Sequence, residues 1–109
     1  MLWVKNELWN VTEVVDGALR PKMDAGKLQE DYINQLYRKQ GIFGDGSTAD
    51  AIRYTKQTGQ LIGGSDHIEK GETAIRSFDN WLSKHPETTE HDKKIINLII
   101  EDFQSALNY

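Results

Sequence analysis

Two loop-to-helix junctions hold the side chains of this chain that are best suited to chemistry. The first, residues 44–53 (GDGSTADAIR), ends in Arg53, and the second, residues 63–71 (GGSDHIEKG), contains His67 and Lys70. An imidazole can accept a proton, while an ammonium and a guanidinium can offset negative charge on a phosphorus centre. Because cleavage of a phosphodiester uses such groups together, we predict His67, Lys70 and Arg53 as the catalytic set.

The spacing within the second junction favours cleavage of RNA. His67 is expected in the first turn of a helix, where the positive end of the helix dipole opposes protonation and keeps a neutral base available. Lys70 follows three residues later and lies on the same helix face. The imidazole would take the proton of the ribose 2′-hydroxyl, and the ammonium would stabilise the phosphorane. Arg53 would bind the phosphate through two hydrogen bonds.

Four further residues are predicted to bind substrate. In residues 44–48 (GDGST), two glycines separated by one residue precede two hydroxyls and a helix start. This arrangement can turn several backbone N–H groups toward an anion. We assign Ser47 and Thr48 to that role, Thr73 as an additional hydroxyl donor, and Tyr54 as a ring that stacks on a base.

Each of these residues also has a structural interpretation, which the sequence leaves open. Glycine, aspartate and serine are the usual residues of a turn before a helix, and Asp45 opposes an anion unless its carboxylate turns away. His67 can be an exposed residue at a helix start, and Lys70 can pair with a neighbouring carboxylate. Arg53 can pair with Asp50 on a solvated face. The convergence of two polar clusters at loop-to-helix junctions favours the catalytic interpretation.

Composition bounds the class of protein. The chain has 109 residues, no cysteine, three histidines and a formal net charge of −4. We expect one domain over residues 1–109, without disulfides, thiolate metal sites or a thiol nucleophile. The three histidines are scattered, so we predict no metal and no cofactor. No apolar run reaches the length of a signal-peptide core or a membrane span, which predicts a soluble module.

Hydrophobic periodicity predicts an all-α fold, a compact bundle of about five helices joined by Gly-rich loops. The first helix should end before Pro21, and its β-branched residues lower its helical propensity. Residues 1–22 are also a candidate remnant of a preceding entry segment. Pro86 is expected in the turn before the last helix, with Thr88 or Thr89 as its N-cap. The predicted helices span about 4–19, 24–41, 48–56, 68–82 and 89–107.

Several of these segments together resemble a known family, the C-terminal toxin domains of bacterial contact-dependent growth inhibition and Rhs-type polymorphic toxins. The similar segments are 44–54 (GDGSTADAIRY), Thr58-Gly59, 67–71 (HIEKG), and Trp81-Leu82 ahead of an acidic-capped final helix. The resemblance covers residues 28–107. Within that family, the chain is most similar to the tRNA-cleaving toxins that act with a translation elongation factor.

The resemblance implies an antibacterial toxin domain that is a metal-independent ribonuclease and cleaves tRNA in a target bacterium. It implies delivery at the far end of a large secreted or cell-surface protein, action in the target-cell cytoplasm, and neutralisation by a cognate immunity protein. Carried over by position, it places the active centre at His67, supported by Lys70, Arg53 and the hydroxyls of Ser47 and Thr48. Elongation factor Tu carrying aminoacyl-tRNA is an implied further partner, because an acidic chain attracts free tRNA weakly.

A non-enzymatic all-α binding module, such as an immunity protein or an adaptor, is the alternative hypothesis. Residues 77–109 contain three basic and six acidic residues, which suit a docking face for a basic partner or a solvated helix face. This alternative predicts harmless expression and dispensable His67, Lys70 and Arg53. Direct DNA recognition by a helix-turn-helix is disfavoured, because no predicted helix is rich in Arg and Lys.

Overall fold

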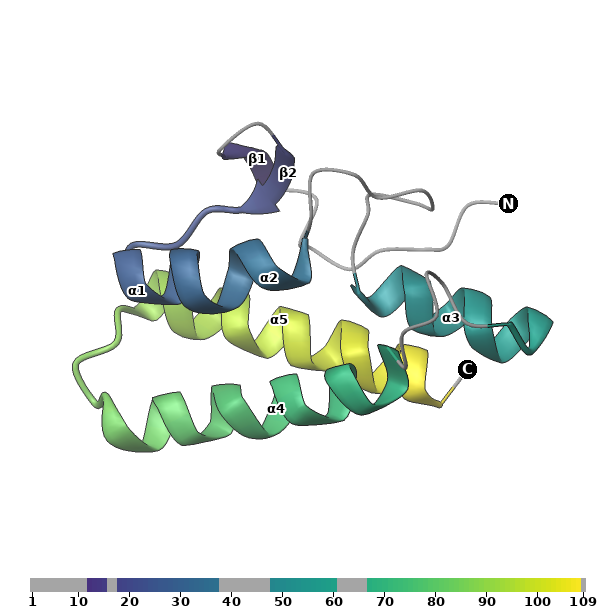
Figure 1. Ribbon diagram of the computed structural model, residues 1–109. Helices are drawn as coiled ribbons and strands as arrows, with labels where there is room; N and C mark the ends of the chain where they lie inside the picture. The colour runs from purple at the N-terminus through teal and green to yellow at the C-terminus, as the bar shows by residue number, and fades with distance from the viewer. Residues whose placement is uncertain (1–11, 16–17, 38–47, 61–66, 109) are drawn as a thin grey trace.

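The computed structural model describes residues 12–15, 18–37, 48–60 and 67–108, and this part of the chain is mostly helical and compact. An antiparallel hairpin of β1 (Thr12–Val15) and β2 (Ala18–Pro21) comes first. The first helix runs over 26–36 in three consecutive segments, α1 (Gly26–Leu28), η2 (Gln29–Ile33) and α2 (Asn34–Leu36). The remaining helices are α3 (Thr48–Thr58), α4 (His67–Lys84) and α5 (Glu90–Leu107) (Figure 1). Among the described residues, no helix is both long enough and apolar enough to span a membrane.

The prediction of a first helix over 4–19 is wrong in its described part, because residues 12–15 and 18–21 form the hairpin. The register pairs Thr12 with Pro21 and Val15 with Ala18. The two residues between the strands are Asp-Gly in sequence, the dipeptide that favours a two-residue hairpin turn. The described residues therefore contain four helices and a hairpin, so the predicted all-α class is confirmed only as far as a mostly helical fold, and a fifth helix is not confirmed. The predicted Gly-rich loops lie outside the described residues.

The helices predicted over 68–82 and 89–107 are confirmed as α4 and α5, which run antiparallel, and Pro86 lies in the short connection between them as predicted (Figure 1). Thr89 is the N-cap of α5, and its hydroxyl accepts a hydrogen bond from the Asp92 backbone N–H at 3.1 Å. In the connection, Thr88 accepts from the Trp81 indole N–H at 3.2 Å and donates to the His85 carbonyl. Polar side chains therefore satisfy backbone groups at both helix ends.

The hydrophobic core lies where the four helices meet. Helix α3, predicted over 48–56, packs against both α4 and α5 and buries Ala51, Ile52 and Thr55. The helix predicted over 24–41 corresponds to α1, η2 and α2, and it ends at Leu36. The largest fully buried apolar side chains come from every helix and are Leu28, Ile33, Ile52, Phe78, Ile95, Ile96, Ile99 and Phe103.

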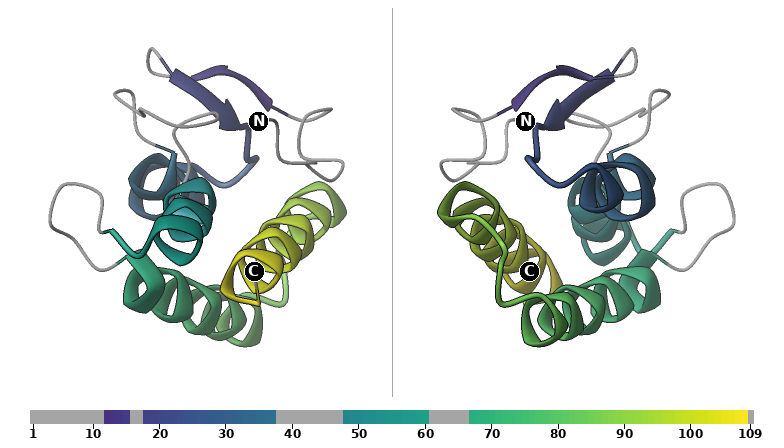
Figure 2. Two further views of the ribbon diagram at one scale, coloured as in Figure 1. Left: turned by 90° about the vertical axis from the view of Figure 1, so that its right-hand side faces the viewer. Right: turned by 90° about the vertical axis from the view of Figure 1, so that its left-hand side faces the viewer.

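Two buried polar side chains tie the N-terminal elements to this core. Arg20 of β2 donates to the carbonyls of Val15 and Tyr37, both at 2.6 Å, and so links the hairpin to the end of α2. Asp92 of α5 accepts hydrogen bonds from the backbone N–H groups of Asp24 and Ala25, ahead of α1. The hairpin lies on the side of the molecule opposite α4 (Figures 1 and 2), which leaves α4 with one face toward the first helix.

Gly71 permits the close approach of α3 and α4. A Cβ atom at this position would lie 2.5 Å from Cδ1 of Ile52, which is fully buried. We expect Gly71→Val to lower the free energy of unfolding by about 1–3 kcal/mol through overpacking. Urea denaturation of Gly71→Val in the wild-type and Ile52→Val backgrounds checks this, because Ile52→Val removes Cδ1. Equal losses in the two backgrounds would show that the contact with Ile52 is not the cause.

A pH-dependent contact closes the turn between α4 and α5. The Glu87 backbone N–H and the His85 side chain, whose Nδ1 lies 3.0 Å from Glu87 Oε1, hold the pKa of the Glu87 carboxyl below its ordinary value of 4.5. A depressed pKa adds stability above the unfolded-state value that is lost as the pH falls through the folded-state value. We therefore expect Glu87→Gln to be less stable than wild type at neutral pH and equally stable well below pH 4.5.

Denaturant titrations across this pH range measure the difference. Glu101→Gln, at another exposed position, is the matched control for removing one carboxylate. A stability difference between wild type and Glu87→Gln that stays constant with pH would contradict the assignment of the effect to ionisation of Glu87.

Candidate functional site

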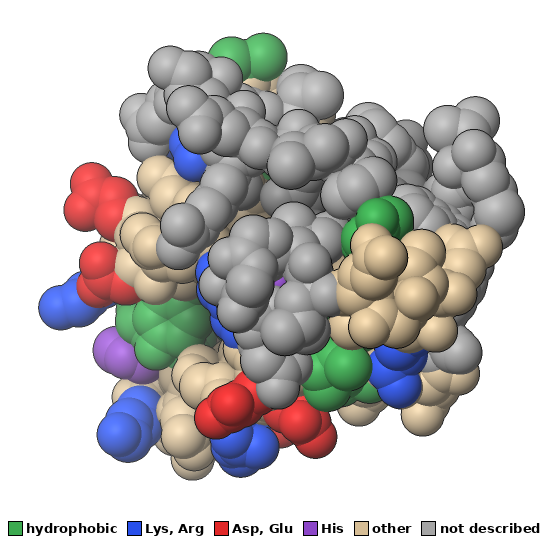
Figure 3. All heavy atoms as spheres, turned by 45° about the vertical axis from the view of Figure 1, so that its right-hand side comes forward, with side chains coloured by type: hydrophobic (Ala, Val, Ile, Leu, Met, Phe, Trp, Pro, Cys, Tyr) green, Lys and Arg blue, Asp and Glu red, His purple; other side chains and the backbone are tan. Residues whose placement is uncertain are grey.

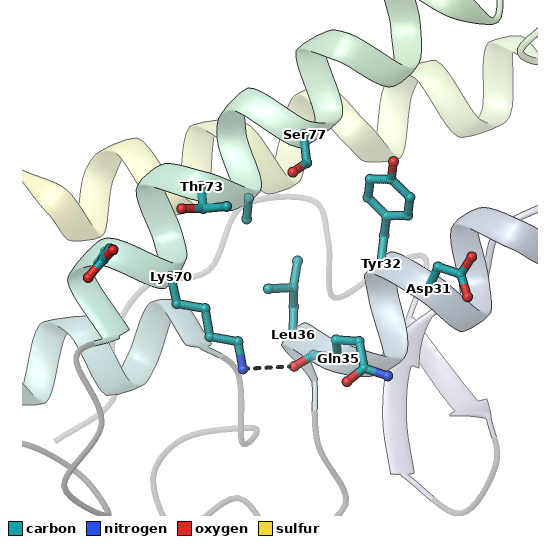
Figure 4. A pocket seen from close by; sticks show the side chains of 9 residues that line it. Asp31, Tyr32, Gln35, Leu36, Lys70, Thr73 and Ser77 are labelled. Atoms are coloured by element: carbon teal, nitrogen blue, oxygen red, sulfur yellow. Dashed lines mark hydrogen bonds between the residues drawn. The ribbon is translucent and has the colours of Figure 1, made fainter.

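An open pocket of about 650 Å³ lies between α4 and the first helix (Figure 4). Its α4 wall includes Lys70, Thr73 and Ser77, which follow one another at helical spacing along one face. The opposite wall comes from η2 and α2 and includes Tyr32 and Gln35. The pocket thus brings together polar groups from segments that are more than thirty residues apart in the sequence.

Lys70 spans this pocket. Its side chain extends from α4 toward the first helix, where Nζ donates a hydrogen bond to the backbone carbonyl of Gln35 at 3.2 Å (Figure 4). The side chain is half-buried, so its charge is held in place yet reaches solvent. An ammonium fixed in this way presents donors to an anion without the loss of rotamer freedom that a mobile lysine would incur.

His67 is the first residue of α4 and is half-buried. It precedes Lys70 by three residues, so the two side chains project from the same face of the helix. The predicted pairing of an imidazole and an ammonium one turn apart on one helix therefore fits the observed helix boundary. His67 stands at the N-terminal end of the helix face that continues through Lys70, Thr73 and Ser77 into the pocket.

Arg53 is placed elsewhere. Its side chain is 3 % exposed, and its guanidinium forms an ion pair with the Asp102 carboxylate and a 3.0 Å hydrogen bond to the Asp102 carbonyl. These contacts join α3 to α5, and Arg53 is not among the described residues that line the pocket. Lys70 thus lines the pocket, and His67 lies one helical turn before it on α4 without being among the described lining residues, whereas the guanidinium is committed to a buried contact between helices.

The residues predicted to bind substrate also lie in different places, and only some of them line the pocket. Thr73 lines the pocket, where its hydroxyl accepts a 3.2 Å hydrogen bond from Arg76. Thr48 is buried and donates to the Leu36 carbonyl at 3.3 Å, so it joins the start of α3 to the end of α2. Tyr54 is half-buried on α3 with its hydroxyl 3.5 Å from Gln60 Oε1. Ser47 lies outside the described residues.

Sequence reasoning missed the wall formed by the first helix, including Tyr32 and Gln35. The middle of that helix, η2, is π-helical: the backbone N–H of Asn34 donates to the carbonyl of Gln29, five residues earlier. A π-turn changes which residues face a neighbouring helix, and such turns occur often at functional sites. A periodicity of 3.6 residues carries no sign of this change. The sequence signal for this wall is limited to the residue types, because a tyrosine can stack on a ring and a glutamine can form hydrogen bonds.

One group of three potential metal ligands, Asp24, His91 and Asp92, occurs among the described residues, with ligand atoms within 4.8 Å of one another. Both Asp92 oxygens accept backbone N–H groups, and Asp24 accepts the Thr89 hydroxyl at 2.8 Å. His91 Nε2 lies 2.8 Å from the Lys22 carbonyl, to which it can only donate. These bonds identify the group as the structural junction between α5 and the segment ahead of α1.

Charge near the pocket is mixed. The exposed carboxylates of Asp31 and Glu69 line the pocket together with Lys70. On the face shown in Figure 3, acidic and basic side chains of the described residues are interspersed. This pattern differs from the continuous basic surface of proteins that bind nucleic acid without assistance.

No family model, no curated protein and no solved structure matches this chain. The functional proposal therefore rests on the residues of the chain itself.

Proposed function

We propose that this chain is an antibacterial toxin domain, a metal-independent ribonuclease that cleaves tRNA in a target bacterium. The observation that carries the proposal is the position of Lys70, whose Nζ the Gln35 carbonyl holds at an open pocket, one helical turn after His67 at the start of α4. A base and a cation about one helical turn apart can both reach one ribose-phosphate linkage.

In the proposed mechanism, the neutral imidazole of His67 removes the proton of the 2′-hydroxyl next to the scissile phosphate. The 2′-oxygen attacks phosphorus, and the Lys70 ammonium offsets the charge that develops on the phosphorane oxygens. The bond from phosphorus to the 5′-oxygen then breaks, and that oxygen takes a proton from Lys70 or from solvent. The products are a 2′,3′-cyclic phosphate and a 5′-hydroxyl end. No metal is required, because the nucleophile belongs to the RNA.

Arg53 is left out of the proposed catalytic set, because its guanidinium is buried in an ion pair with Asp102. We assign catalysis to His67 and Lys70. Thr73 supplies a supporting hydroxyl in the pocket that Lys70 lines. Arg53 becomes a positioning residue that fixes α3 against α5 through Asp102. The net charge of −4 supports elongation factor Tu as a partner, which would concentrate tRNA at a site with little cationic surface of its own.

Induction of the chain in a bacterium without an immunity protein tests this function. The expected result is growth arrest together with tRNA fragments that end in a cyclic phosphate, seen on a gel of total RNA. Protection by co-expression of a cognate immunity protein is expected, because the producing cell must survive. Normal growth with intact tRNA would overturn the proposal.

A second function, a non-enzymatic binding module such as an immunity protein or an adaptor, is favoured by the Arg53–Asp102 pair. That pair explains one of the three predicted catalytic side chains by folding alone. The acidic excess over residues 77–109 would then serve a basic protein partner. Harmless expression and a stable complex with a basic protein are the results expected for this module.

A further inference from the structure

The pocket beside Lys70 has features that the attack on phosphorus does not use. We propose that it binds one unpaired nucleotide next to the scissile phosphate, so that the domain cleaves RNA only where the strand is single. This inference rests on the proposed ribonuclease function and adds the class of substrate site to it.

The size of the pocket suits one nucleotide. Its volume of about 650 Å³ falls within the ~300–1,000 Å³ of small-molecule sites. A base that is paired and stacked in a helix cannot enter a pocket of this kind, because it must first leave the stack. A single-stranded segment presents its bases without that cost. The pocket therefore selects against duplex RNA through its shape.

The lining suits a nucleobase, which has apolar faces and polar edges. Leu36 and Ala74 are buried side chains that contribute apolar surface. Hydroxyls of Thr73 and Ser77 project from α4, and the Gln35 amide belongs to the opposite wall (Figure 4). Hydroxyl and amide groups both donate and accept hydrogen bonds, so they can pair with the edge of a base.

Tyr32 supplies a fixed aromatic group at the pocket. Its ring lies 5.5 Å from that of Phe78 and 5.6 Å, edge-on, from that of Trp81. These contacts hold the ring while part of it stays accessible. Aromatic side chains are the usual stacking partners of unpaired bases. Tyr32 belongs to the π-helical segment η2, and π-turns occur often at functional sites.

The charged side chains of the pocket indicate where a phosphate and a base of the RNA would lie. Among the described residues that line the pocket, Lys70 is the cation, and its position suits the scissile phosphate. The exposed carboxylates of Asp31 and Glu69 lie on the same lining and repel a second phosphate. They are also acceptors for the N–H groups on the edge of a base. The site therefore accommodates one phosphate at Lys70 and an uncharged base within the pocket.

The first experiment fills the pocket. Ser77→Leu introduces a bulky side chain at the α4 wall, and Ser83→Leu makes the same change at an exposed position of α4 outside the lining. We expect Ser77→Leu to slow cleavage of total tRNA by about 10- to 100-fold, the loss typical of one stacked base. Ser83→Leu should cleave at the wild-type rate. Equal activity of the two variants would overturn the pocket assignment and leave the proposed ribonuclease intact.

The second experiment keeps the wild-type protein and changes the substrate. A short RNA that contains the cleavage site is expected to be cut alone and protected when annealed to its complement. Cleavage of both forms at one rate would contradict the requirement for an unpaired nucleotide.

The third experiment needs no catalysis. NMR titration with adenosine or uridine monophosphate should shift the signals of Tyr32 and Ser77, whereas inorganic phosphate should shift signals near Lys70 alone. Identical shifts with nucleotide and phosphate would overturn base binding. If the wild-type protein cleaves no RNA, the proposed function fails, and this titration still decides whether the pocket takes a nucleotide.

Discussion

His67→Ala is expected to lower the rate of tRNA cleavage by about 100- to 10,000-fold, the usual contribution of a general base. The physical reason is that the proposed mechanism assigns removal of the 2′-hydroxyl proton to the His67 imidazole. His67 is half-buried at the first position of α4, so its replacement by alanine should leave the fold unchanged. Circular dichroism and urea denaturation check the fold, and quantified gels of tRNA check the rate.

Two matched controls are available on the same part of the chain. His85→Ala removes another histidine, and Lys84→Ala removes a lysine in the last turn of α4. Lys84 lies about 25 Å along the helix from His67, at 1.5 Å per residue. Both controls should cleave at the wild-type rate, whereas Lys70→Ala should be impaired like His67→Ala. Unchanged cleavage by His67→Ala would remove the imidazole from the mechanism and require another group to take the 2′-hydroxyl proton.

The second large effect concerns stability. Asp102→Ala is expected to lower the free energy of unfolding by about 3–5 kcal/mol, because it leaves the buried Arg53 guanidinium without its counter-ion. The side chains of both residues are nearly inaccessible, at 3 % and 4 % exposed. Thermal or urea denaturation measures the loss. A loss below about 1 kcal/mol would mean that the pair behaves like a solvent-exposed salt bridge.

Replacing both charges separates the structural role of Arg53 from a catalytic one. Arg53→Met together with Asp102→Leu removes the ion pair and fills the space with apolar groups. Such replacements are often neutral or stabilising, so the double variant should fold. We expect it to cleave tRNA at a rate close to wild type. A folded double variant with no activity would return Arg53 to the catalytic set.

The sequence alone determined the helices that have a long amphipathic pattern. The isoleucines of α5 recur at helical spacing, and Thr89 precedes two acidic residues, so the helix and its N-cap followed from local rules. The same holds for α3 and α4. Adjacency of His67 and Lys70 on one face also followed, because a three-residue spacing within a helix fixes it.

Tertiary structure decided every feature that depends on partners distant in the sequence. Arg53 was expected at a phosphate, yet its guanidinium meets Asp102, forty-nine residues away, because a buried charge needs an opposite charge wherever the packing supplies one. The strands β1 and β2 replaced a predicted helix because their pairing outweighs a weak helical pattern.

The pocket likewise required the three-dimensional arrangement. Tyr32 and Gln35 line one pocket with Lys70 only because the first helix packs opposite α4. Helical periodicity describes one element at a time, since it reports which side of that element is apolar. The identity of the opposing surface is set by packing among elements, so the sequence specified the helices and their catalytic candidates, and the fold specified which of those candidates share a pocket.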